Sequence, residues 1–79
     1  MSLRYQRLKR EVQERVLING EGTAKDADRI MRKSFQEVLD HLHKEWDLLY
    51  DNDRHVQAFD KMRDINMLKG MIVEYETRQ

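Results

Sequence analysis

Acidic and histidine side chains at helical spacing are the residues of this 79-residue chain most able to do chemistry. Glu37, His41 and Glu45 recur every four residues, so they would share one face of a helix where a metal could in principle bind. Asp40 and His43 are three apart, loosely like the Glu-x-x-His element of di-iron bundles. Such sites need matching carboxylates from other helices. The sequence therefore favours a solvated face here, and we expect neither a metal nor a cofactor.

Other catalytic arrangements also fail on residue type or spacing. The segment 51–53, Asp-Asn-Asp, begins like a calcium loop, but it lacks the glycine at position six and the glutamate at position twelve. A turn is the better interpretation, with Asp53 capping the next helix. Serine occurs only at Ser2 and Ser34, and no glycine-rich phosphate loop or paired-acid cleft can be assembled. We expect no catalytic residue and no enzymatic activity.

A basic run opens the chain, although its 15 basic and 15 acidic side chains leave the whole chain neutral. These cations could contact phosphates, with the ring of Tyr5 stacking on a base. They could equally form an exposed helix face paired locally with Glu11 and Glu14. Neutrality favours the second interpretation, and nucleic-acid binding stays the alternative. The cations concerned are Arg4, Arg7, Lys9 and Arg10.

The elements that carry these residues are predicted to be helices, because proline is absent and glycine occurs only three times. We predict helices at 2–17, 24–50 and 54–77 in one domain spanning 1–79. Thr23 and Asp26 resemble a capping box at the start of the central helix. That helix carries one apolar stripe at spacings of three and four, formed by Met31, Phe35, Val38, Leu42, Trp46 and Leu49.

The turn around Asn52 is short, so the second and third helices should form a long antiparallel hairpin with coiled-coil-like packing. The third helix has a seam spaced by seven residues. Gly70 interrupts this seam and predicts a close backbone approach or a slight kink. The seam consists of Ala58, Ile65 and Ile72, and we expect Trp46, Phe35, Phe59 and Ile65 to line the packing between the two helices.

The first helix is the part least tied to the hairpin. A linker at 19–22, Asn-Gly-Glu-Gly, should end it, since asparagine and glycine accept left-handed backbone angles after a last helical turn. The two long helices reach about 36–40 Å, whereas a compact chain of this size is about 30 Å across, so an elongated fold would bury too little surface alone. We therefore predict a homo-oligomer or a larger partner. The predicted interface consists of Tyr5, Leu8, Val12, Val16, Met67 and Met71.

The segment 59–75, FDKMRDINMLKGMIVEY, resembles the ending of small helical proteins that tailed bacteriophages encode among their head and packaging genes. The resemblance implies an assembly or virion-associated protein that works through helix packing, located in the host cytoplasm or in the particle. It covers only this C-terminal stretch and includes no functional residue. No apolar run approaches the roughly 18 residues of a membrane span, so no membrane partner is expected.

Overall fold

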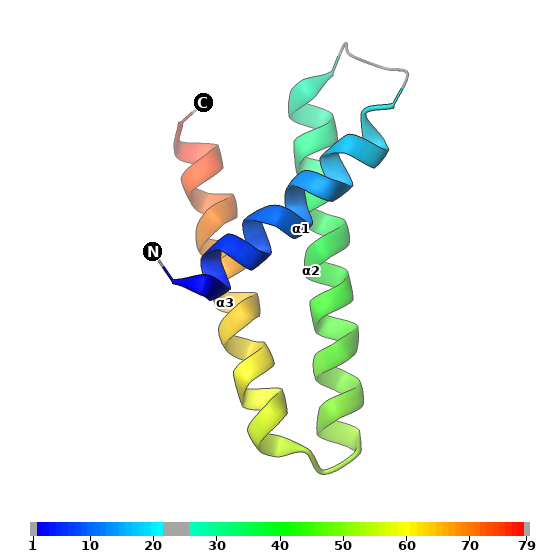
Figure 1. Cartoon of the computed structure of the whole chain (residues 1–79), viewed down its shortest axis with the longest axis vertical. Helices are drawn as coiled ribbons and strands as arrows, with labels where there is room; N and C mark the ends of the chain where they lie inside the picture. Colours follow the sequence, from blue (N-terminus) through cyan, green and yellow to red (C-terminus); the bar gives the residue numbers. More distant parts are fainter. Residues whose placement is uncertain (1, 22–25, 79) are drawn as a thin grey trace. The chain divides into compact units, whose positions relative to one another are not determined.

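The computed structural model describes residues 2–21 and 26–78, which form three α-helices and, over those residues, no strand (Figure 1). The helices are α1 (Leu3–Asn19), α2 (Ala27–Asp51) and α3 (His55–Thr77). The predicted all-α fold is confirmed, and every helix boundary lies within three residues of its predicted position. The predicted cap residue Thr23 lies outside the described residues. None of the described helices is long and apolar enough to cross a membrane.

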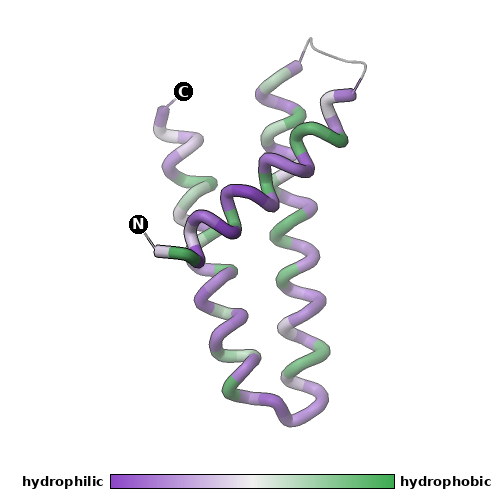
Figure 2. Tube along the Cα trace, in the orientation of Figure 1, coloured by the Kyte–Doolittle hydropathy of each residue, from purple (hydrophilic) through white to green (hydrophobic). Residues whose placement is uncertain are grey.

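The chain divides into two compact units, Met1–Val38 and Leu39–Gln79. Helix α2 contributes to both units, since the boundary falls within it. Apolar positions recur along α2 between hydrophilic ones, as Figure 2 shows. This pattern gives each unit part of the predicted apolar stripe: Phe35 and Val38 are buried in the first, and Leu42 in the second.

In the first unit, α1 begins at the N-cap Ser2, whose hydroxyl accepts a hydrogen bond from the Tyr5 amide at 3.1 Å. Its buried residues are Leu8 and Val12, one turn apart. The N-terminal half of α2 buries Ser34, which donates a hydrogen bond from Oγ to the Ile30 carbonyl at 2.7 Å. The hydroxyl is therefore satisfied within its own helix.

The end of α1 differs from the prediction. Helix α1 continues through Asn19, and the C-cap Gly20 has a right-handed backbone with φ −88°, so no left-handed residue is used there. The Gly20 amide donates to the Val16 carbonyl at 2.8 Å. A Cβ added to Gly20 would lie 3.0 Å from that oxygen and 3.7 Å from Cδ1 of Ile30. Glycine is thus suited to this position by a close approach, not by its φ angle.

In the second unit, a Schellman motif ends α2 and leads into α3. The Arg54 amide donates to the Leu49 carbonyl at 2.9 Å, and the Asp53 amide donates to Tyr50 at 3.1 Å. Asp53 has the left-handed φ of 59° that such a motif requires. The predicted role of Asp53 as a cap of α3 is wrong, because the N-cap is Arg54 and no side chain caps that end.

The buried residues of α3 are Ala58, Asp64, Ile65 and Leu68, which include two of the three seam residues predicted at sevenfold spacing. Phe59 was expected to line the packing, but 67% of its surface is exposed. The smaller Ala58 is buried instead, at 2% exposure. No close approach occurs at Gly70, since a Cβ built there meets no atom within 4 Å, and the alternative of a slight kink stays a prediction.

Candidate partner-binding surfaces

Eight large apolar side chains are exposed in the described part of the chain, and seven of them fall on two surfaces. One surface extends along α1, with Leu3 at its start and Leu17 and Ile18 about 21 Å further on, near its end. The other surrounds the turn between α2 and α3 and contains Leu48, Tyr50, Val56 and Phe59. We call them the α1 outer face and the tip. Single exposed apolar residues are ordinary on a protein surface, whereas clusters with a polar rim mark interaction sites.

The α1 outer face lies opposite the buried face of the same helix. At about 100° per residue, positions 3, 7, 10, 14 and 17 fall on one arc, while the buried positions 8 and 12 fall on the other side. The arc reads Leu-Arg-Arg-Glu-Leu, so its first half is apolar and cationic. A shallow depression of about 420 Å³ there is lined by Leu3, Arg4, Gln6, Arg7 and Arg10.

The residues predicted as a partner interface occupy other positions. Leu8 and Val12 are already buried within the chain, at 0% and 2% exposure. The remaining four predicted interface residues are half-buried: Tyr5, Val16, Met67 and Met71. Their role as an interface stays a prediction.

The predicted phosphate-contacting cations lie along α1. Arg7, Lys9 and Arg10 are exposed, and Arg4 is half-buried. Arg4 and Arg7 also interact within the chain. These cations are therefore accessible, although two of them already have partners.

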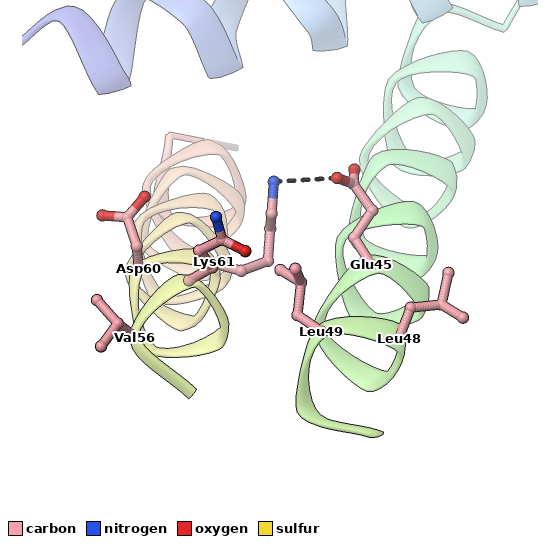
Figure 3. Close-up of a pocket in the computed structure, with 7 residues that line it drawn as sticks. Glu45, Leu48, Leu49, Val56, Asp60 and Lys61 are labelled. Atoms are coloured by element: carbon pink, nitrogen blue, oxygen red, sulfur yellow. Dashed lines mark ion pairs between the residues drawn. The ribbon is translucent and has the colours of Figure 1, made fainter. Parts of the chain in front are cut away.

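The tip contains a groove of about 680 Å³ between α2 and α3. In Figure 3, Leu49 lies between the two helices, and Lys61 extends from α3 toward Glu45 of α2. Nζ of Lys61 and Oε2 of Glu45 are 3.1 Å apart, and this ion pair spans the groove. The lining is apolar toward the turn and polar away from it, and consists of Glu45, Leu48, Leu49, Val56, Gln57, Asp60 and Lys61.

An aromatic row follows the tip from one helix to the next. The rings of Trp46 and Tyr50 stack with centroids 5.1 Å apart, and Tyr50 meets His55 edge-on at 5.0 Å. Phe59 follows one turn after His55 on α3, and the guanidinium of Arg63 lies 5.6 Å from its ring centroid. The sequence offered the aromatic residues but no signal that they would follow one another across the turn.

The two surfaces have opposite charge. Of the four cations at residues 2–10, Arg7 and Arg10 lie on the first half of the α1 outer face, and Glu14 follows on its second half. Residues 45–63 include the groove-lining Lys61 and the Arg63 that lies over Phe59. They carry five exposed or half-buried acids, Glu45, Asp47, Asp51, Asp53 and Asp60, against the three cations Arg54, Lys61 and Arg63. The neutrality of the whole chain therefore conceals a basic first half of the α1 outer face and a tip with a small excess of acids.

The residues considered for a metal site have other partners. Glu37 accepts a hydrogen bond from Asn19 at 3.0 Å and pairs with Arg15 at 3.4 Å. His41 lies 2.7 Å from Glu45, which also pairs with Lys61. Across residues 2–21 and 26–78, no group of three or more histidine, cysteine or acidic side chains is placed to hold a metal ion.

Asn19 connects α1 to α2 in a way that the sequence analysis missed. Its Nδ2 donates to Oγ of Ser34 at 3.1 Å as well as to Glu37. The sequence analysis placed Asn19 in a linker. Because α1 continues through Asn19, its side-chain amide reaches α2. We call Asn19, Ser34, Glu37 and Arg15 the polar clamp.

Comparison of this chain with models of known protein families, with curated protein sequences and with solved structures finds no match.

Proposed function

We propose that this protein is a non-enzymatic helical module that binds another protein, either a second copy of itself or a larger structural partner. The proposed frame is the antiparallel hairpin of α2 and α3 with coiled-coil-like packing, whose tip carries the binding surface. No cofactor takes part in this role.

The observation that supports the proposal best is the composition of the tip. Val56 is 85% exposed and Leu48 64%, and both line one groove. Phe59, which is 67% exposed, follows Val56 by three residues on α3. Charged groups of Glu45, Asp60 and Lys61 rim that groove. An apolar centre with a polar rim is the ordinary composition of a protein-binding site.

The likeness of residues 59–75 to phage head and packaging proteins extends the proposal to virion or head assembly. In that setting the protein would act in the host cytoplasm or within the particle. Mass spectrometry of purified particles, from a phage whose genome encodes this chain, tests this extension. Recovery at a constant ratio to the major structural proteins would support it, and absence from particles and assembly intermediates would contradict it.

The general proposal is tested by chemical cross-linking in cells that produce the protein, followed by mass spectrometry. The matched pair is Val56→Lys at the tip and Val73→Lys, since Val73 is also exposed, at 58%, but lies outside both surfaces. We expect the tip substitution to remove specific cross-links to protein, whether to a second copy or to another chain, and Val73→Lys to retain them. Equal cross-linking in both variants would contradict the proposal.

Nucleic-acid binding is the second candidate, because the α1 outer face contains exposed cations. Anisotropy titrations with duplex and single-stranded DNA at two salt concentrations test it. Three or four phosphate contacts would give a log–log salt slope of about −3 to −4. Binding with that slope, lost on replacing Lys9 and Arg10 by Gln, would favour this candidate over the first.

A further inference from the structure

We propose that the tip groove binds the basic first half of the α1 outer face of a second copy of this chain. This inference rests on the proposed function and makes it specific. The occupant is a helix led by Leu3, whose exposed leucine enters the apolar part of the groove and whose cations meet the net negative charge of the tip.

Charge and apolar character together identify the occupant. Leu3 is 83% exposed and is followed on the same helix by the exposed cations Arg7 and Arg10. The tip offers exposed Leu48 and Val56 within an excess of acids. Two tips carry charge of the same sign and would repel each other, and so would the basic ends of two α1 helices. A tip and a basic α1 end attract each other, and their exposed apolar side chains can pack together.

The apolar and charged groups are spaced alike on the α1 outer face and on the tip. Leu3 and Arg7 are separated by four residues, a rise of about 6 Å, and Val56 and Asp60 of α3 are separated by the same rise. A helix aligned with α3 therefore places its leucine over Val56 and its arginine beside Asp60. Arg7 and Asp60 each already interact within their own chain, so the contact depends on the net charges of the two surfaces and not on unpaired groups.

Such a contact joins two different surfaces and is therefore heterologous. Each copy would use its α1 outer face toward one neighbour and its tip toward another. The association would grow head to tail, or close into a ring, and would weaken as salt screens the opposite charges.

The experiment uses three variants of the full chain. The α1 variant combines Leu3→Asp with Arg10→Glu, the tip variant combines Leu48→Lys with Val56→Lys, and Val73→Lys is the control. All five positions are exposed, so circular dichroism and melting should match the wild type. If a double variant melts at a lower temperature than the wild type, a single charge change at an exposed position replaces it. This change is Arg10→Glu for the α1 variant and Asp47→Lys for the tip variant.

Sedimentation from about 10 μM to 1 mM covers the affinity range of a small interface. We expect the wild type to associate as its concentration increases. Each double variant should raise the dissociation constant about tenfold or more, and the control should change it little. Mixing the α1 variant with the tip variant is the decisive step. The mixture keeps one intact tip and one intact α1 outer face, so it should form a two-chain species at wild-type strength.

Two results would overturn the inference. One is wild-type association that neither variant weakens or that mixing does not restore, and the other is a wild type that stays monomeric up to 1 mM, the upper end of that range. In both cases the proposed function is decided separately by the cross-linking of Val56→Lys against Val73→Lys. Tip-dependent cross-links to a different protein would leave the function standing without the second copy.

Discussion

The ammonium of Lys61 on α3 lies 3.1 Å from the Oε2 of Glu45 on α2, and this ion pair joins the two helices across the groove. The same ammonium lies 3.8 Å from Oδ2 of Asp64, whose side chain is 2% exposed. Lys61 therefore lies within ion-pair distance of two acids, Glu45 and Asp64, and Asp64 is buried.

Replacing Lys61 by Met should lower the free energy of unfolding by about 1–2 kcal/mol, because the buried Asp64 and Glu45 lose a cation that they share. Urea denaturation followed by circular dichroism measures this change. Lys69→Met is the control, since Lys69 is an exposed lysine of the same helix. Equal effects in the two variants would show that Lys61 adds nothing beyond an ordinary surface lysine.

Removing the Asn19 amide should also destabilise the protein. Asn19→Ala loses the hydrogen bonds to Ser34 and Glu37, and we expect a loss of about 1–2 kcal/mol. Gln13→Ala, at an exposed position of α1, should change the stability by less than about 0.5 kcal/mol. An Asn19→Ala protein as stable as Gln13→Ala would mean that the polar clamp contributes no net stability.

Asp53 is a position where glycine should be better than the native residue. Its φ of 59° costs an ordinary L residue about 1–2 kcal/mol, so Asp53→Gly should raise the melting temperature. Asp53→Ala should give no such gain, because alanine is also strained at positive φ. The contact of Asp53 with Nε2 of His55, at 3.6 Å, is solvent-exposed and should not reverse this order. The prediction fails if Ala stabilises as much as Gly.

The two described glycines should respond oppositely to alanine. Gly70 is exposed within α3, and an added Cβ meets nothing within 4 Å, so Gly70→Ala should stabilise the protein by about 1 kcal/mol. At Gly20 the Cβ would press on the Val16 carbonyl at 3.0 Å, and Gly20→Ala should give no gain or a loss. Thermal melts of both variants test this, and a stabilising Gly20→Ala would contradict it.

The two phenylalanines should differ most of all. Phe35 is 5% exposed, and Phe35→Ala should cost about 3–5 kcal/mol. Phe59 is largely exposed, so Phe59→Ala should cost less than about 1 kcal/mol while removing part of the tip. Denaturant titrations of both variants distinguish the two environments. Comparable losses would mean that Phe59 is covered in solution.

The contrast between the buried Phe35 of α2 and the exposed Phe59 of α3 shows how far the sequence predicted the fold. Along most of α2 the apolar residues recur at spacings of three and four, so Phe35, Val38 and Leu42 were correctly predicted to share a covered stripe, and Leu48 outside that stripe is exposed. Apolar residues lie on several sides of α3, including Val56, Phe59 and Val73, and periodicity alone could not select the covered side.

The candidate surfaces were less predictable than the helices. Helical spacing already separated Leu8 and Val12 from Leu3 and Leu17 on α1. The sequence did not show which face the chain covers itself: Leu8 and Val12, predicted to meet a partner, are buried within the chain. The basic run itself was visible in the sequence. Its acidic counterpart was not recognised, because the acids of the tip were interpreted as a turn and a helix cap.

The stack of Trp46 on Tyr50 has a consequence for measuring this protein. Trp46 is the sole tryptophan of the chain, and it lies in the second unit beside the tip. Its fluorescence will therefore report on that unit, whereas far-ultraviolet circular dichroism averages over all three helices. If the two signals change together on heating, the units unfold as one cooperative body. If the fluorescence changes separately, the protein contains its own optical probe for the stability of a single unit.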